Sequence, residues 1–247
     1  MDIKQYLDST YLKTAVQAGL TDEQNLEVVK SAIAEAIAYN FKLIMIRPEV
    51  VRLAKSMIID AGSKVAVGTV IDFPLGRGTL QRKLDEAAKA IGDGADDLDF
   101  VADYEAFKRG EYDGVKQQVL ECTRLGLSNG KIVKWIIEVA ALDDHEIVQL
   151  SALIKNVVLA NFDESAYPKV FVKSSTGFYK TRDGIPNGAT LPAIKLMLEN
   201  AYPLPVKAAG GVRNIQEAGQ MIILGVKRIG TSSARAIAEG QSAEGGY

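Results

Sequence analysis

Residues 170–177 read Val-Phe-Val-Lys-Ser-Ser-Thr-Gly, an apolar run that ends on a lysine and then breaks into small polar residues. Branched and aromatic residues favour a β-strand, and alternation along it puts Phe171, Lys173 and Ser175 on one face. A lysine on an apolar strand either reaches water with its ammonium or loses its proton and does chemistry. A second run of the same design, at 204–211, carries Lys207 before two glycines. Two ammonium groups at the ends of neighbouring strands would repel, so the repeated pattern favours a functional pair.

Short β-type runs alternate with helical patterns along the whole chain. Eight runs are expected as strands, at 5–10, 41–46, 64–71, 97–102, 131–139, 170–174, 205–209 and 227–231. Apolar residues recur with the helical period of 3.6 over 22–39, 79–92, 143–158 and 214–224. This order predicts the α/β class and a (β/α)8 TIM barrel, a single domain over 1–247 with a flexible C-terminal tail at about 240–247. An open doubly wound sheet is the alternative, but such sheets usually have a glycine-rich loop after the first strand, which this sequence lacks.

The composition limits the possible partners and compartments. The net charge is −2 and no basic run reaches five residues, which argues against nucleic acid and anionic membranes as partners. No apolar run approaches the roughly 20 residues that span a bilayer, and the N-terminus has no signal-peptide pattern. Cys122 is the only cysteine and His145 the only histidine, so we expect no disulfide, no Cys/His metal site and no cofactor. A cytoplasmic protein is expected, with Cys122 as a buried free thiol.

Polar residues cluster where the predicted strands end, which is where barrel enzymes hold their active groups. Alternation predicts that the polar face of these strands points into the barrel and the apolar face outward, under the helices. The polar residues expected there are Asp8, Thr10, Asp97, Asp99, Lys134, Glu138, Lys173 and Lys207. Asp97 and Asp103, taken singly, are expected to be structural partners or solvated ends.

The last two strands are each followed by a glycine- or serine-rich turn. Gly210 and Gly211 follow Lys207, and Ser232 and Ser233 precede a short helix. Barrels often bind phosphate with the loops after strands 7 and 8, through backbone amides and a helix N-terminus. We therefore predict a phosphate site between these two turns.

The paired lysines predict a nucleophilic mechanism. A lysine must lose its proton to attack a carbonyl, and burial together with a neighbouring cation lowers its pKa. Lys207 could supply that cation to Lys173, although the residues alone allow the two roles to be exchanged. An interior carboxylate such as Asp99 could relay protons around the reacting carbon. The hypothesis is a metal-free, Schiff-base lyase acting on a small sugar phosphate.

The chain resembles the deoxyribose-phosphate aldolase family. The resemblance runs from Leu7 to Ala234 in the family's order, and Tyr247 matches its C-terminal tyrosine. The matching stretches are LDSTYLK at 7–13, FPLG at 73–76, EAAKAIGDGADDLDFV at 86–101, KWIIE at 134–138, FVKSSTGF at 171–178, NGAT at 187–190, VKAAGGVR at 206–213 and IGTSSA at 229–234. The two lysine motifs are the specific part of this match.

The resemblance implies reversible cleavage of 2-deoxy-D-ribose 5-phosphate to D-glyceraldehyde 3-phosphate and acetaldehyde. It implies that Lys173 forms the Schiff base, that Lys207 lowers its pKa, and that Asp99 moves protons through water, with Tyr247 assisting. Substrate or phosphate binding is expected from Asp8, Thr10, Lys134, Thr176, Gly177, Gly210, Gly211, Ser232 and Ser233. The phosphosugar and the aldehyde would be the only partners besides further copies of the chain, because the family is commonly oligomeric, most often a dimer.

Several positions depart from the family pattern. Asp72 stands where a glycine or asparagine usually precedes FPLG, Val139 replaces a threonine, Asp103 replaces an asparagine, and the second strand ends in MIRP at 45–48. Two other functions remain open. One is another metal-free barrel aldolase or isomerase of sugar phosphates, and the other is a non-catalytic sugar-phosphate-binding barrel.

Overall fold

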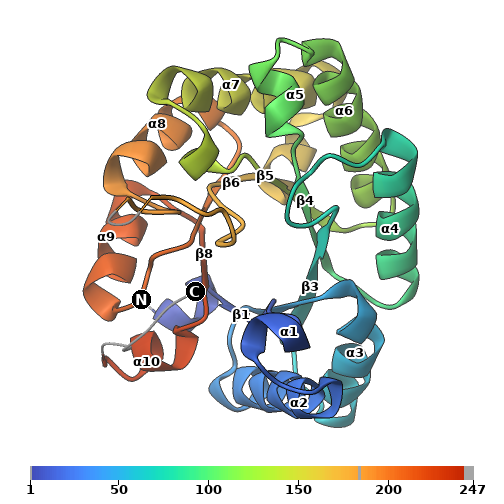
Figure 1. Cartoon of the computed structure of the whole chain (residues 1–247), viewed down its shortest axis with the longest axis vertical. Coiled ribbons are helices and arrows are strands. Elements are labelled where there is room, and N and C mark those ends of the chain that lie inside the picture. Colours follow the sequence, from blue (N-terminus) through green and yellow to red (C-terminus); the bar gives the residue numbers. More distant parts are fainter. Residues whose placement is uncertain (1, 183–184, 242–247) are drawn as a thin grey trace.

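The computed structural model describes residues 2–182 and 185–241, and within them eight parallel strands close into a barrel surrounded by helices (Figure 1). The strands are β1 (Leu7–Thr10), β2 (Leu43–Ile46), β3 (Ala66–Ile71), β4 (Asp97–Val101), β5 (Ile132–Ile136), β6 (Val170–Lys173), β7 (Val206–Ala209) and β8 (Arg228–Thr231). Each strand pairs with the next, and β8 pairs with β1, so the sheet has no open edge. The predicted (β/α)8 barrel is confirmed.

The helices lie outside the barrel, between consecutive strands (Figure 1). They are α1 (Ala15–Ala18), α2 (Asp22–Tyr39), α3 (Val51–Asp60), α4 (Leu80–Gly92), α5 (Tyr104–Lys108), α6 (Tyr112–Ser128), α7 (Asp144–Asn161), α8 (Leu191–Ala201), α9 (Ile215–Leu224) and α10 (Ala234–Ala238). Short 3-10 helices occupy Ile3–Tyr6, Pro48–Val50, Val139–Ala141 and Glu164–Lys169. A capping box begins α7, where Asp143 and Glu146 bond each other's backbone, as the sequence predicts. Across the described ranges, no helix has both the length and the apolar character needed to span a membrane.

Every strand lies inside a predicted run, but the predicted runs were too long, and at two of their ends the chain forms a 3-10 helix instead. The run 5–10 begins as the 3-10 helix Ile3–Tyr6, and β1 starts only at Leu7. The run 131–139 ends as a strand at Ile136, because Glu138 adopts a left-handed backbone with φ of 57° and the chain then turns into a 3-10 helix. That turn carries the Glu138 side chain toward the loop after β6.

The barrel interior has an apolar side and a charged side. On the apolar side, Leu43, Met45 and Val70 form a buried cluster with Leu12. Gly68 makes room for it, since a Cβ at this position would lie 2.6 Å from the Met45 side chain. The remaining strands, from β4 round to β1, present charged residues to the interior.

The apolar residues of β4 and β5 face the helices, as alternation predicts. Phe100 and Trp135 stack with ring centroids 5.1 Å apart, and the indole N–H of Trp135 donates to Thr123 on α6 at 3.0 Å. Both aromatic residues belong to the main hydrophobic core between the barrel and the helices. The charged face of these strands must therefore point inward, and the prediction that the polar set lies inside is confirmed.

Candidate active site

Lys173 and Lys207 lie side by side inside the barrel. They are directly paired residues of the parallel strands β6 and β7. Each ammonium nitrogen lies 2.9 Å from the same oxygen, Oδ2 of Asp99 on β4. One carboxylate thus holds both amines in contact with it, and the two side chains converge as the sequence hypothesis requires.

The environment of Lys173 favours the neutral amine. Burial lowers the pKa of Lys173 to about 8; Asp99 opposes this shift, while Lys207 adds to it. Lys207 has more anionic support, because it pairs with Asp8 at 2.6 Å as well as with Asp99. Of the two amines, Lys173 therefore has the weaker anionic support.

Asp99 is held in its ionised form. Burial raises the pKa of this carboxyl, but the charges of Lys134, Lys173 and Lys207 outweigh burial and hold it well below the usual value. Lys134 reaches the other oxygen, Oδ1, at 2.7 Å. A carboxylate fixed between three amines can accept a proton from, or return it to, a group bound at Lys173.

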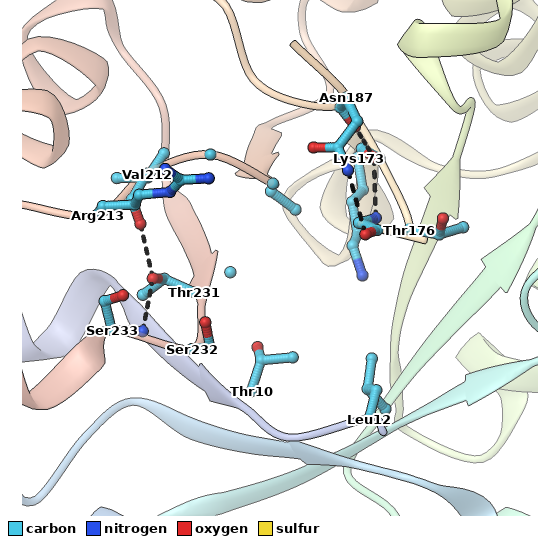
Figure 2. Close-up of a pocket in the computed structure, with 16 residues that line it drawn as sticks. Thr10, Leu12, Lys173, Thr176, Asn187, Val212, Arg213, Thr231, Ser232 and Ser233 are labelled. Carbon is cyan, nitrogen blue, oxygen red and sulfur yellow. Dashed lines mark hydrogen bonds between the residues drawn. The ribbon is translucent and has the colours of Figure 1, made fainter. Parts of the chain in front are cut away.

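A pocket opens at the C-terminal ends of β6, β7, β8 and β1, and the Lys173 ammonium points into it (Figure 2). Of the residues predicted to bind substrate, those that line it are Thr10, Thr176, Gly177, Gly210, Gly211, Ser232 and Ser233. Figure 2 shows Lys173 and Thr176 on one side, with Arg213, Ser232 and Ser233 on the other. Asp8 and Lys134 are fully buried in the charged interior and do not line the pocket. Their role in substrate binding stays a prediction.

The turns after β7 and β8 have a fixed backbone geometry. Gly210 and Gly211 both have positive φ, of 83° and 85°, which only glycine adopts easily. On the neighbouring turn, Thr231 donates its hydroxyl proton to the carbonyl of Val212 at 2.7 Å and accepts from the Ser233 amide at 2.9 Å. This bond ties the loop after β8 to the loop after β7.

Sequence reasoning missed three residues that shape the pocket. Asn187 and Arg213 line it, although neither stands at the end of a predicted strand. Glu138 lies behind it, 1% exposed, and accepts bonds from the hydroxyls of Ser175, at 2.7 Å, and Thr176. Alternation along the fifth run had placed Glu138 on the polar face, but only the fold brings it to the loop after β6.

Gly230 differs from Gly210 and Gly211 because it lies within a strand and not in a turn. It lies within β8 beside Lys207, and a Cβ there would approach Lys207 Cε to 3.0 Å and Ala209 Cβ to 3.3 Å. A side chain at this position would crowd the aliphatic stem of the lysine. Gly230 therefore leaves the space in which Lys207 extends across the barrel.

Other predicted positions have structural roles or lie outside the described residues. Asp97 pairs with Lys134 at 2.7 Å, and Asp103 caps α5 by accepting from the Ala106 amide at 2.8 Å. Both contacts agree with the prediction that these aspartates, taken singly, are structural partners. Tyr247 and residues 242–246 of the predicted tail lie outside the described residues.

The comparisons with known proteins agree with the site. No model of a known protein family matches the chain. The deoxyribose-phosphate aldolase of Thermococcus gammatolerans is 39% identical over 241 residues, covering 97% of this chain and 96% of that protein. Deoxyribose-phosphate aldolase 1 of Staphylococcus aureus is 37% identical over 248 residues, covering 100% of both chains.

Solved structures of aldolases are also similar to this chain over most of its length. The aldolase QR15 superposes with a TM-score of 0.80 at 32% identity, covering 97% of this chain and 95% of its own. A deoxyribose phosphate aldolase from Aeropyrum pernix, described as having a unique tetrameric structure, superposes with a TM-score of 0.76 at 29% identity, covering 96% and 89%. Relatives above 30% identity match nearly the whole chain, the barrel is the same, and the amine pair lies where the family motifs predict it. The chain belongs to the deoxyribose-phosphate aldolase family.

Proposed function

We propose that this enzyme reversibly cleaves 2-deoxy-D-ribose 5-phosphate to D-glyceraldehyde 3-phosphate and acetaldehyde, with Lys173 as the Schiff-base nucleophile. The observation that carries the proposal is the shared contact of Lys173 and Lys207 with Asp99 Oδ2, each at 2.9 Å. A site that only binds a sugar phosphate has no need for a buried amine whose pKa is lowered to about 8.

The chemistry follows from these three groups. The neutral amine of Lys173 adds to the substrate aldehyde, and loss of water gives a protonated imine. The bond between C2, next to the imine carbon, and the hydroxyl-bearing carbon C3 then breaks. Its electron pair forms the enamine double bond as the imine π electrons move to the nitrogen, and the C3 hydroxyl loses its proton as C3 becomes the new aldehyde carbon. Asp99, working through water, takes and returns protons, and Lys207 keeps the local charge positive. Protonation of the resulting enamine and hydrolysis release acetaldehyde and restore Lys173.

The residues that line the pocket are proposed to bind the phosphate and the hydroxyl groups of the substrate. We assign the phosphate to the turns of Gly177, Gly210 and Gly211 and to the hydroxyls of Ser232 and Ser233, all of which line the pocket. The helix after this last turn, α10, has only five residues. We therefore assign the phosphate contacts to backbone amides and hydroxyls, and not to the N-terminus of that helix. Thr10 and Thr176 also line the pocket and are assigned to the sugar hydroxyl. Tyr247 is proposed to assist proton transfer from the C-terminal tail.

We also propose that the chain works as a homo-oligomer in the cytoplasm, as a single domain. The tetramer described for the Aeropyrum pernix relative supports an oligomer, and the lone buried cysteine, Cys122, suits a reducing compartment. Light scattering on the purified protein would give the number of copies, and a monomer at all concentrations would contradict the oligomer.

The test of function combines turnover with trapping. Purified enzyme is assayed for aldehyde release from 2-deoxy-D-ribose 5-phosphate, then treated with acetaldehyde and borohydride and mapped by peptide mass spectrometry. We expect turnover, and a reduced adduct on Lys173. Lys173→Met should lose both, whereas Lys195→Met, at an exposed lysine on α8, should keep both. An adduct on another lysine would refute the assignment.

The same assay separates the rival functions. A barrel aldolase with a ketone donor would release dihydroxyacetone phosphate from a ketose phosphate and would leave the deoxy sugar intact. A non-catalytic barrel would bind the phosphosugar without releasing either aldehyde.

A further inference from the structure

Six charged side chains form a closed ring inside the barrel, alternating in sign. We call it the charge ring, and its members in order are Arg228, Asp8, Lys207, Asp99, Lys134 and Asp97. The successive contacts are Arg228–Asp8 at 2.6 Å, Asp8–Lys207 at 2.6 Å, Lys207–Asp99 at 2.9 Å, Asp99–Lys134 at 2.7 Å, Lys134–Asp97 at 2.7 Å and Asp97–Arg228 at 3.4 Å. Each carboxylate thus bridges two cations, and each cation bridges two carboxylates.

Lys173 stands outside this ring. Among the described residues it makes one ion pair, to Asp99 Oδ2, the oxygen that Lys207 already contacts. The ring holds three cations and three anions, so it is neutral by itself. A proton on Lys173 would add a fourth cation, with no anion of its own, to a site where Lys173 is only 3% exposed.

Arg228 and Asp97 contact each other at 3.4 Å and so close the ring. Neither has an ion pair with Lys173 in the part of the chain that the structure describes, and neither lines the substrate pocket. Arginine keeps its charge at every working pH, so Arg228 is the fixed cation of the set. The groups that do face Lys173 are Asp99 on β4, Lys134 on β5, Glu138 after β5 and Lys207 on β7.

We propose that Arg228 and Asp97 are positioning residues that complete the charge balance of the ring and thereby make Lys173 the amine of the site that loses its proton most readily. The inference rests on the proposed function, in which Lys173 is the nucleophile. Without the Arg228 charge, three carboxylates would share Lys134 and Lys207, and a proton on Lys173 would restore neutrality. Without the Asp97 charge, three cations would share two carboxylates, and Lys173 would lose its proton more readily.

The two substitutions therefore have opposite signs, which a merely structural role would not give. Arg228→Gln should move the acidic limb of the pH profile of kcat/KM upward by about one pH unit, because loss of a buried positive charge favours the protonated form of Lys173. Asp97→Asn should move it downward by a similar amount. The double variant has equal numbers of cations and anions in the ring again, so its acidic limb should return to the wild-type position. Arg228→Lys keeps the positive charge and should leave the midpoint of the limb unchanged.

The measurement is the pH dependence of kcat/KM on 2-deoxy-D-ribose 5-phosphate, with circular dichroism at each pH to confirm the fold. The rate of reductive labelling of Lys173 by acetaldehyde and borohydride, followed by peptide mapping, gives the same midpoint without turnover. If Arg228→Gln does not fold, Asp97→Asn and the double variant still test the sign.

Two results would overturn the inference. One is a loss of rate at every pH with the midpoint unmoved in folded Arg228→Gln and Asp97→Asn, and the other is a shift of both midpoints in the same direction. A wild-type label on a residue other than Lys173 would instead refute the proposed function, so the two failures are distinguishable.

Discussion

Lys173 and Lys207 are opposite each other on adjacent strands, and their ammonium nitrogens share one oxygen of Asp99 at 2.9 Å each. Two ammonium groups that contact one carboxylate oxygen in a buried site repel each other, which favours the loss of a proton from one of them. Lys207 has a second anion, Asp8, whereas Lys173 opens into the substrate pocket. We therefore propose that the amine that reacts is Lys173, which has the weaker anionic support and lies against the pocket.

The first prediction concerns pH. Burial lowers the pKa of Lys173 to about 8, so the reactive free base increases as pH rises toward 8 and the inactive ammonium dominates below it. We expect kcat/KM to fall about tenfold for each pH unit below this point. Stopped assays in constant-ionic-strength buffers would measure it. A profile that stays flat from pH 6 to 8 would contradict the assignment of the neutral amine.

The second prediction separates imine formation from proton transfer. Asp99→Asn removes the carboxylate that contacts Lys134, Lys173 and Lys207, and with it the relay for protons. General acid–base groups contribute about 10²–10⁴-fold, so kcat should fall by that range. Removing the anion also favours the neutral form of Lys173, so borohydride trapping of acetaldehyde should persist. If trapping disappears together with turnover in a folded variant, Asp99 acts on the first step instead.

The third prediction concerns the protonation state of the Glu138 carboxyl group. The hydroxyl of Ser175 lies 2.7 Å from Glu138 Oε1 and 2.7 Å from the carbonyl of Asn187, and it accepts from the Gly177 amide at 2.9 Å. One hydroxyl proton cannot serve both acceptors fully, so we predict that Glu138 carries a proton and can donate it to Ser175 when the Ser175 hydroxyl donates to Asn187. Burial raises the pKa of Glu138 in agreement with this count, although Thr176, Ser175 and Lys173 oppose the shift.

A neutral amide should therefore replace Glu138 with little loss. We expect Glu138→Gln to raise KM for the phosphosugar by less than about threefold, whereas Glu138→Ala should raise it by about tenfold or more, since it leaves the loop donors unpaired. Ser175→Ala is the matched control for the same loop. If Glu138→Gln raised KM as much as Glu138→Ala, the carboxyl would have to be ionised. If neither variant raised KM, the loop would not depend on Glu138.

The sequence predicted the barrel because its β-type runs and helical patterns have clear periods, and the eight strands lie inside the eight predicted runs. It also predicted that Lys173, Lys207 and Asp99 would meet, because strand ends in a parallel barrel converge. It could not predict that Arg228 would bridge Asp8 and Asp97, since residues 220 and 131 positions apart have no pattern that links them. Glu138 was missed as a site residue for a related reason, because its direction depends on a left-handed backbone at the end of β5.

The last prediction concerns stability and the position that departs from the family pattern, Asp72. The ammonium of Lys83, fully buried on α4, contacts Asp72 Oδ2 at 2.5 Å and donates to the carbonyls of Gly76 at 2.9 Å and Val101 at 2.8 Å. Asp72 has a left-handed backbone with φ of 53°, and its carboxylate also accepts from the Gly78 amide at 2.7 Å. The pair thus fixes the loop between β3 and α4.

Lys83→Met keeps the stem but leaves a buried carboxylate and two carbonyls without this donor, so we expect it to lower the free energy of unfolding by about 3–5 kcal/mol. Lys83→Met combined with Asp72→Asn should recover part of that loss, because no unpaired charge remains and the amide oxygen can still accept from Gly78. Lys89→Met, on the exposed face of the same helix, is the control and should leave the free energy of unfolding nearly unchanged. Urea unfolding followed by circular dichroism would measure all three, and a double variant no more stable than Lys83→Met would show that the loss comes from the carbonyls and packing, not from the unpaired Asp72.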